Sequence, residues 1–298
     1  MTHPFRFGVV SAFARTGDEW AEKARRVESL GYSTLVVPDN LRYTLSPLSA
    51  LAVAAAATRT LRVGTYVLAN DYRNPVMLAK EAATLDLLSG GRLELGLGAG
   101  RPDAADDNRM LGLPFDRGGV RVSRLAESLA LLKKLLAGET VSASGPSYGV
   151  SDATVTPPPV QRPHPPILVA GIGPRLLSVA AREADIVAFS WAPTENEEAA
   201  AEKVRLVRQA AESRFEHLEL NLNLMAVGDR VPQQVTARMG LDAAALAASG
   251  SIAALTGTTD EMCETLLRRR DRLGISYLLV GDELMDALAP VVERLTGR

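Results

Sequence analysis

The sequence predicts an α/β fold, a (β/α)8 TIM barrel made from a single domain of residues 1–298, with insertions after strands four and seven. Eight short apolar segments are each followed by a helical pattern, which favours a barrel of about 250 residues plus insertions over an open doubly wound sheet. Residues 61–101 contain a strand, a helix and a second strand, which must form a parallel unit with a right-handed crossover. Glycine or polar residues follow the strands, and the carboxyl ends of barrel strands are where barrels bind their ligands.

The first part of the chain shows three pairs of a strand and a helix. The strands are short apolar runs, expected at residues 5–10, 34–37 and 63–68. The helices carry apolar residues at helical spacing and are expected at residues 16–30, 47–58 and 75–88. Thr16 with Glu19 has the pattern of a capping box, and Asn74 is a good N-cap in front of Pro75, which suits the first helical position.

Five further strands are expected in the rest of the chain, at residues 93–98, 167–170, 186–190, 219–227 and 275–280. The helices between and after them are expected at 118–137, 174–182 and 195–213. A further helix is expected to begin at a capping box of Thr258 and Glu261, and the last one at 282–296, with an interruption at Pro290. Three stretches lack the barrel pattern. Residues 101–117 indicate a long polar loop, residues 138–166 hold seven of the chain's 17 prolines and indicate an excursion, and residues 228–257 indicate an inserted helical segment.

Composition and charge exclude several classes of protein. Hydrophobic residues make up 47% and charged residues 23% of the sequence, and the formal charge of -2 gives no general attraction to nucleic acid or to an anionic membrane. Cys263 is the only cysteine, which excludes an internal disulfide and a cysteine-based metal cluster. No segment reaches the roughly 18 apolar residues of a membrane span, and the N-terminus lacks the pattern of a secretory signal. We therefore expect a cytoplasmic enzyme or binding protein with a small-molecule substrate and with neither a nucleic acid nor a membrane as partner.

Two glycine turns that follow predicted strands are candidates for phosphate binding. One is Gly171-Ile172-Gly173, before a helix that begins at Pro174, and the other is Gly98-Ala99-Gly100. Glycine lets a backbone approach closely, and a helix N-terminus offers free N–H groups and a positive dipole end to an anion. Either turn alone has an ordinary explanation, because glycine is common in tight connections. Two such turns at one rim favour a phosphate-bearing cofactor, although the GxGxxG dinucleotide fingerprint is absent.

Other residues at the strand ends are open to two interpretations. Asp39 and Asn40 can orient a cofactor ring or a substrate, or Asp39 can cap the next turn. Trp191 can line a pocket or pack as an ordinary rim tryptophan. The histidines stand at positions that favour surface residues, and the sequence contains neither a GxSxG motif nor a cluster with metal-ligand spacing. Binding turns with few acids, bases or nucleophiles are typical of an enzyme whose cofactor carries the chemistry.

Five segments carry a resemblance to a known family. They are VVPDN, LRVGTYVLAN, ATLDLLSGGRLELGLGAG, PPILVAGIGPRLLSVAAREADIV and GTTDEMCETLLRRRDRLGISYLLV. Together they resemble the bacterial luciferase-like monooxygenase superfamily, and within it the oxidoreductases that depend on coenzyme F420, a deazaflavin. The resemblance covers residues 5–295 and implies a barrel whose cofactor ring lies across the rim near Asp39 and Asn40.

The resemblance also implies where the cofactor is held. In the family a bulge after strand three, often with a non-prolyl cis peptide, supports the back of the ring, and its matching positions here are Tyr66 and Val67. The phosphate positions correspond to Ala99 and Gly100 and to the turn Gly171, Ile172 and Gly173. No metal site is implied.

Two positions depart from the family pattern. Members that oxidise sugar phosphates have Asp-His at the end of strand two and Glu just after the strand-four turn, where this chain has Asp39-Asn40 and Arg101. Neither Asn nor Arg is a general base near neutral pH, so alcohol oxidation assisted by that pair is not expected. Asn40 can still hydrogen-bond a carbonyl or a ring nitrogen, and Arg101 can hold an anionic substrate or the cofactor phosphate.

Three functions follow as expectations. The first is a reductase that passes hydride from reduced F420 to an activated C=C or C=N bond, the second is a monooxygenase that uses reduced FMN and oxygen, and the third is a non-catalytic flavin-binding barrel. Arg101 and Trp191 are expected in the substrate pocket. A homodimer is also expected, through the apolar helices 46–58 and 75–88, whose residues can equally pack against neighbouring helices of the same barrel.

Overall fold

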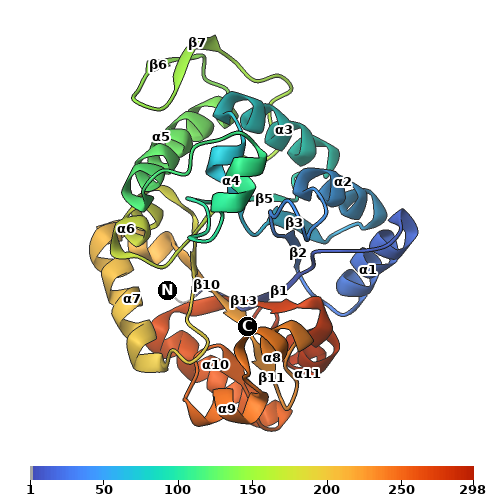
Figure 1. Cartoon of the computed structure of the whole chain (residues 1–298). Helices are drawn as coiled ribbons and strands as arrows, with labels where there is room; N and C mark the ends of the chain where they lie inside the picture. The colour runs from blue at the N-terminus through green and yellow to red at the C-terminus, as the bar shows by residue number, and fades with distance from the viewer. Residues whose placement is uncertain (1–2) are drawn as a thin grey trace.

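Eight parallel strands close into a barrel in the computed structural model, which describes residues 3–298 (Figure 1). The barrel strands are β1 (Arg6–Val10), β2 (Thr34–Val37), β3 (Arg62–Thr65) with its continuation β4 (Leu68–Ala69), β5 (Leu93–Gly98), β8 (Ile167–Gly171), β9 (Ile186–Phe189), β10 (Glu219–Leu224) and β13 (Ile275–Gly281). Neighbours pair in the order β3, β2, β1, β13, β10, β9, β8, β5, and the pairing of Val63 with Leu93 joins β3 to β5 and closes the ring. The (β/α)8 barrel predicted from the sequence is confirmed.

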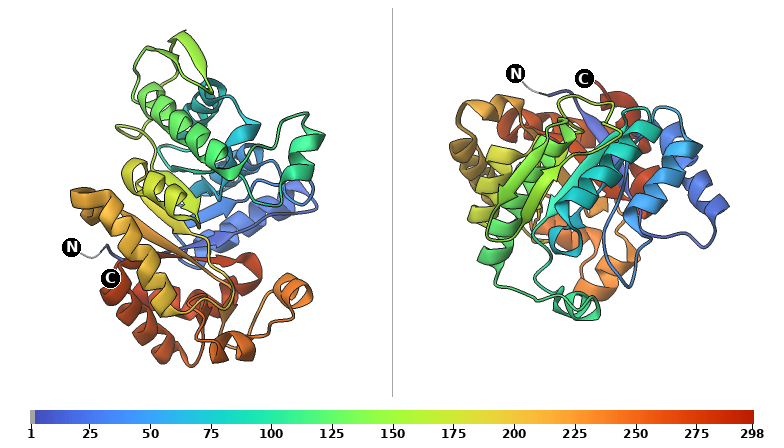
Figure 2. Two further views of the ribbon diagram at one scale, coloured as in Figure 1. Left: turned by 60° about the vertical axis from the view of Figure 1, so that its left-hand side comes forward. Right: turned by 90° about the horizontal axis from the view of Figure 1, so that it is seen from above.

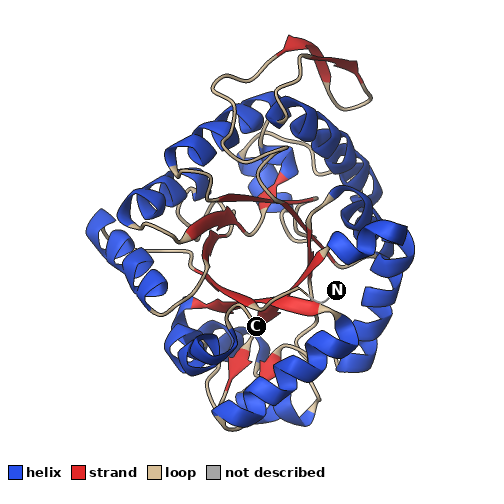
Figure 3. Cartoon of the chain, turned by 180° about the vertical axis from the view of Figure 1, so that it is seen from behind, coloured by secondary structure: helices blue, strands red, loops and turns tan. Residues whose placement is uncertain are grey.

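A ring of helices surrounds the strands, as the view from behind shows (Figure 3). These helices are α1 (Gly17–Ser29), α2 (Pro47–Ala57), α3 (Pro75–Leu88), α5 (Gly118–Leu136), α6 (Pro174–Glu183), α7 (Glu197–Ala211), α10 (Thr259–Leu273) and α11 (Met285–Leu295). Thr258 and Glu261 form a complete capping box at α10. At α1, Thr16 accepts from the N–H of Glu19 as expected, but the Glu19 carboxylate accepts from the N–H of Arg15, so the box is incomplete.

Successive side chains of each strand point alternately outward and into the barrel, and this divides the apolar core into two layers. On β5, Leu93, Leu95 and Leu97 are fully buried in the layer between the strands and the helices. The residues between them point into the barrel. A second layer fills the barrel interior and contains Val36, Leu168, Ile186, Ala188, Tyr277 and Leu279. Because both faces of the strands are buried, their sequences are nearly continuous apolar runs.

Charged side chains fill the barrel at the amino ends of its strands. Arg6 donates to Glu94 at 2.6 Å and to Glu219 at 2.5 Å, and its guanidinium lies 3.5 Å from the ring centroid of Tyr277. Arg62 also donates to Glu94 at 2.6 Å. Burial opposes the charge on Glu94, but the attraction of Arg6 and Arg62 holds the pKa of its carboxyl below the usual value. A buried and mutually neutralised network therefore closes this end of the barrel.

The insertion after strand four differs in part from the prediction. The expected polar loop at 101–117 contains a helix, α4 (Ala105–Met110). Buried Asp107 on α4 pairs with Arg101 at 3.2 Å and with Arg42 at 3.7 Å, so contacts with other loops stabilise a helix that has little apolar periodicity. The Pro-rich excursion at 138–166 forms an antiparallel hairpin of β6 (Val141–Ser144) and β7 (Gly149–Ala153), which projects from the barrel beside α5 (Figures 1 and 2).

The seventh barrel strand is shorter than predicted. β10 ends at Leu224, and the residues expected to extend it form β11 (Ala226–Val227), which pairs with β12 (Ala254–Leu255) in a separate sheet. Between them lie α8 (Gln233–Met239) and α9 (Ala243–Ala248), as expected of a helical insertion. The short 3-10 helices are η1 (Asn70–Tyr72), η2 (Glu212–His217) and η3 (Asp282–Leu284).

The closing helix α11 is not interrupted at Pro290, contrary to the prediction. Proline at this position removes one hydrogen bond, to the carbonyl four residues earlier, which lies in the first turn. Leu288, Val291 and Val292 on the same helix are fully buried, and their burial offsets the lost bond.

Candidate active site at the carboxyl ends of the strands

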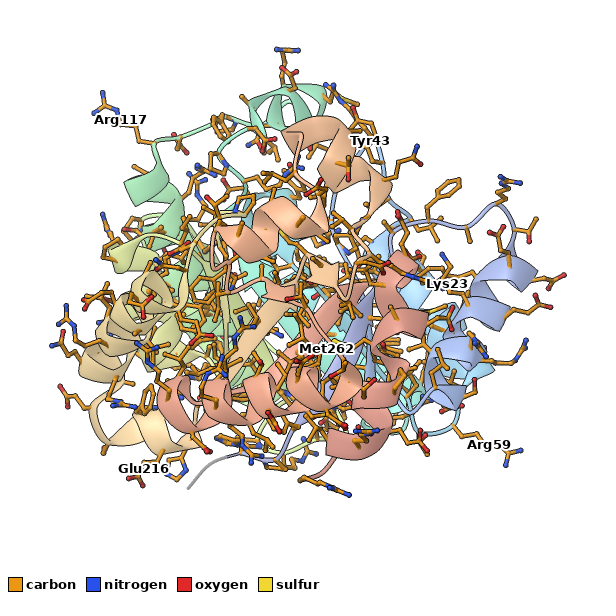
Figure 4. The ribbon with its side chains drawn as sticks, turned by 90° about the horizontal axis from the view of Figure 1, so that it is seen from below. Lys23, Tyr43, Arg59, Arg117, Glu216 and Met262 are labelled. Atoms are coloured by element: carbon orange, nitrogen blue, oxygen red, sulfur yellow. The ribbon has the colours of Figure 1, made fainter. Side chains whose placement is uncertain are left out.

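The carboxyl ends of the strands form the mouth of the barrel. In Figure 4, Tyr43 and Arg117 lie at the mouth end, together with α4, and Arg59 and Glu216 lie at the opposite end. The loops that follow β1, β2, β5 and β8 border this mouth, and these loops carry most of the site residues expected from the sequence. The geometry of a barrel thus brings residues from distant parts of the chain to one rim.

The third strand is interrupted at Tyr66 and Val67, which are joined by a cis peptide bond, as the resemblance implied. The glycines of β5 leave room for this interruption. A Cβ atom on Gly96 would lie 2.0 Å from the carbonyl oxygen of Thr65, and one on Gly98 would lie 2.8 Å from a methyl group of Val67. Tyr66 and Val67 are partly exposed and pack against the apolar layer inside the barrel.

Two asparagines of β10 add polar groups to the barrel interior. The Tyr66 hydroxyl donates to Oδ1 of Asn221 at 3.0 Å, and Nδ2 of Asn221 donates to the carbonyl of Tyr277 at 3.1 Å. Asn223 pairs in register with Leu279, a residue of the interior layer, and so faces the same side nearer the mouth. Its buried Oδ1 has no hydrogen-bond partner among the described residues. The sequence analysis missed both asparagines.

Asp39 and Asn40 follow the second strand, and the side chains of both stabilise the loops around them. Asp39 accepts a hydrogen bond from the N–H of Ala69 at 3.1 Å and forms an ion pair with Arg73 at 2.6 Å. Its carboxylate therefore ties the end of strand two to the end of strand three. Oδ1 of Asn40 accepts from the backbone N–H of Tyr43 at 3.1 Å and shapes its own turn.

The turn after β5 is held by Arg121, which the sequence analysis did not single out. This buried guanidinium, on α5, donates from Nη1 to the carbonyls of Ala99 at 2.8 Å and Gly100 at 2.9 Å. Gly100 has a φ of +82°, a conformation that suits glycine. Arg101 follows with a half-exposed side chain paired to Asp107 at 3.2 Å. Arg101 thus has a carboxylate partner within the loop.

The turn after β8 leads directly into a helix N-terminus. Gly171 packs closely, since a Cβ there would lie 2.5 Å from the side chain of Leu176, and Gly173 is the N-cap of α6. Between them, Ile172 is 54% exposed at the rim. Arg175 in the first turn of α6 donates to the hydroxyl of Ser123 at 2.7 Å, near the start of α5. Backbone N–H groups and a guanidinium are therefore available here to an anion.

Trp191 lies in the layer outside the barrel. It is 7% exposed, and its ring centroid lies 4.9 Å from that of Phe189 and 4.8 Å from the ammonium of Lys203. This position favours a tryptophan that packs at the rim over one that lines a pocket.

The titratable groups expected of acid–base catalysis are scarce at the mouth. His3, His164 and His217 each precede a barrel strand and so lie at the opposite end. Within residues 3–298 no three His, Cys, Asp or Glu side chains gather in a way that could hold a metal ion. Over the same residues, no helix is long and apolar enough to cross a membrane. The carboxylates described at the mouth, those of Asp39, Asp107 and Asp282, are each held in an ion pair with Arg or Lys, and the other groups that the mouth offers are amides, backbone groups and apolar surface.

Comparisons with known proteins agree with this description. The sequence profile of a family described as luciferase-like monooxygenase matches residues 3–291. F420-dependent glucose-6-phosphate dehydrogenases of Microbacterium testaceum and Beutenbergia cavernae are 31% and 34% identical over 194 and 168 residues. These alignments cover 62% and 53% of this chain and 56% and 48% of the relatives, so the chain spans about half the length of the curated relatives it matches.

Solved structures share the whole fold at low sequence identity. The coenzyme F420-dependent tetrahydromethanopterin reductase from Methanopyrus kandleri has a TM-score of 0.79 at 18% identity, covering 98% of this chain and 100% of that chain. A monooxygenase from Streptomyces bottropensis has a TM-score of 0.72 at 24% identity, covering 97% of each chain. At these identities the likeness shows the fold alone.

Proposed function

The chain belongs to the luciferase-like monooxygenase family, and we propose that it is an oxidoreductase that transfers hydride between coenzyme F420 and an activated C=C or C=N bond of a small organic substrate. The names of the curated relatives support F420 as the cofactor. The observation that carries the proposal is the buried amide oxygen of Asn223, which has no hydrogen-bond partner among the described residues and faces the same side of the sheet as the apolar layer inside the barrel. This combination suits a flat ring that has hydrogen-bonding edges.

The residues of the mouth fit such a ring. Tyr66 and Val67, with Val10 and Ala170, border the interior layer and offer apolar surface to one face of a ring. The buried Oδ1 of Asn223 can accept a hydrogen bond from a ring N–H, and buried polar atoms generally have such a partner. Ala99, Gly100 and the turn at 171–173 would hold the phosphate end, beside the N-terminus of α6.

The side chains present favour reduction over alcohol oxidation. When bound in its reduced form, F420 would supply the hydride. An amide such as that of Asn40 and a guanidinium are not general bases near neutral pH, and Arg101 is in addition paired with Asp107. Reduction of an electron-poor double bond needs a proton at the second atom, and solvent at the open rim can provide it. The residues of this mouth therefore need only to orient the reactants and to shield the ring from one side.

Two alternatives use the same mouth. Reduced FMN with oxygen would make the protein a monooxygenase, as the family's description suggests. A non-catalytic flavin-binding barrel is the third possibility, since the mouth has few catalytic groups.

Cofactor titrations distinguish these functions. The protein is titrated with F420 and with FMN, each oxidised and reduced, and each reduced complex is then mixed with oxygen. We expect F420 to bind at micromolar concentration or below, the reduced complex to resist oxygen, and an activated alkene or imine to oxidise it. The variant N223L should bind F420 about tenfold more weakly, the loss of roughly one well-placed hydrogen bond. Rapid oxidation of bound FMN supports the monooxygenase instead. Tight binding without turnover supports the non-catalytic barrel, and binding of neither cofactor rejects all three.

The outer face of α2 and α3 is the proposed contact between two copies of the chain. Val53, Met77, Leu87 and Leu88 on this face are 44%, 59%, 45% and 74% exposed. α2 carries no charged residue, and on α3 the exposed Lys80 and Glu81 lie between the apolar Met77 and Leu87. Exposed apolar side chains grouped on adjacent helices are typical of a subunit interface. A homodimer in solution is the expected assembly.

A further inference from the structure

We infer, on the basis of the proposed function, that the substrate is a neutral and largely apolar molecule, bound between the loop at 40–46 and α4 above the barrel mouth. Three features of the mouth lead to this class of substrate. They are the exposed apolar side chains of the rim loops, the pairing of four rim cations with carboxylates, and the apolar lining that continues into the barrel.

The first feature is a group of large apolar side chains exposed on separate rim loops. They come from the loops after β1, β2, β5 and β8, and they are Phe13, Leu41, Tyr43, Met110, Leu111 and Ile172. Their exposed fractions run from 40% for Leu41 to 64% for Tyr43. Single exposed apolar residues are ordinary, but four loops that each present one at the same opening are typical of a binding site for apolar groups.

The second feature is that four cations of the rim are already paired with carboxylates. Arg42 pairs with Asp106 at 3.6 Å and with Asp107 at 3.7 Å, which ties the second loop to α4. Arg101 pairs with the same Asp107. Arg73 is bound to Asp39 and Lys23 to Asp282, each at 2.6 Å. To bind any of these four cations, a phosphorylated or carboxylated substrate would have to displace a carboxylate, whereas a neutral substrate leaves the pairs intact.

The third feature is continuity between the rim and the interior. Val10, Val67 and Ala170 stand at the inner edge of the mouth and pack on the apolar layer that holds Ala188 and Leu279. An apolar molecule that enters at Met110 or Tyr43 therefore meets apolar surface down to the proposed ring site. Arg42 and its two carboxylates fix the position of the loop relative to α4.

A series of alkylated cyclohexenones tests the inference. The alkyl chain grows from methyl to hexyl, and reduced F420 is the hydride donor. Burial of one methylene contributes about 0.8 kcal/mol, which is about fourfold in kcat/KM, so partial burial predicts a rise of two- to fourfold per added methylene. Glucose 6-phosphate should be neither oxidised nor bound. A kcat/KM that does not depend on chain length overturns the inference.

A binding measurement separates this inference from the proposed function. Nile red, a neutral apolar dye, should fluoresce on binding at the mouth, and the hexyl compound should displace it at a lower concentration than the methyl compound, whether or not turnover occurs. Absence of turnover with such displacement rejects the hydride transfer alone. Displacement that is equal along the series, or equally strong displacement by glucose 6-phosphate, rejects the apolar site.

Two variants localise the site. M110Q, at a position 60% exposed on the rim, should weaken both Nile red binding and kcat/KM for the hexyl compound about fivefold, with the methyl compound changed by less than twofold. V160T, at a position 49% exposed near Gly91 and away from the mouth, is the control and should behave as the wild type. An equal effect of both variants, or none of M110Q, contradicts binding at the rim.

Discussion

Replacing Gly96 with alanine tests the account of the interruption in the third strand. The new Cβ would lie 2.0 Å from the carbonyl oxygen of Thr65 and 3.0 Å from a methyl group of Val67, and contacts of a real Cβ essentially never fall below 3.0 Å. Strands β3 and β5 would have to separate by about 1 Å, and the obstructing atom belongs to the backbone, so no side-chain rotation relieves the contact. We expect G96A to lower the free energy of unfolding by about 3 kcal/mol or more.

Alanine at two further glycines should destabilise the protein less than G96A, in proportion to the space around each position. At Gly98 the nearest atom, at 2.8 Å, belongs to the side chain of Val67, so G98A should cost only about 1–2 kcal/mol. At Gly149 nothing lies within 4 Å, and G149A should change stability by less than about 0.5 kcal/mol. Urea unfolding followed by circular dichroism measures all three. F420 binding should weaken in G96A and G98A but not in G149A. Equal unfolding midpoints for G96A and G149A would refute the reasoning.

Three other predictions concern stability, the proposed phosphate turn and assembly. Burial opposes the charge on Glu28, but hydrogen bonds from the backbone at 59–61 lower its pKa to about 2, so E28Q should destabilise the protein by about 1 kcal/mol at pH 7. Because the folded pKa is depressed, this difference should shrink as the pH falls from 4.5 towards 2, and urea unfolding at a series of pH values checks it. R121M leaves the carbonyls at the end of β5 without their donor, and we expect about tenfold weaker F420 binding in a fluorescence titration. L88K should give a monomer by light scattering with unchanged circular dichroism, and a persistent dimer would contradict the proposed interface.

The repeating part of the fold was predictable from the sequence because burial on both faces leaves a local signal. Strands β2 and β5 have the predicted bounds, and the N-cap Asn74 begins α3 as expected. The helix α4 was not predictable in this way. It depends on Asp107 and its pairs with Arg42 and Arg101, which come together only in the folded chain.

The candidate site was predictable in position but not in detail. The glycine turns and Asp39-Asn40 stand at strand ends, where the barrel rule places them at the mouth. Asn221 and Asn223 alternate with leucines on β10, a pattern that indicates a strand but does not say which face points into the barrel. Arg121 lies in an amphipathic helix, and its partners are backbone carbonyls, which leave no trace in the sequence.

The charged network at the amino ends of the strands has a kinetic consequence. Glu94 and Tyr277 are 3% and 0% exposed and, with Arg6, fill the barrel there, so a ligand enters and leaves the interior by the mouth alone. When two ligands share one entrance, the one that lies deeper must arrive first and depart last. With the proposed cofactor lying deeper than the proposed substrate, we therefore expect the cofactor to bind first and to leave last, an order that a passage open at both ends would not require.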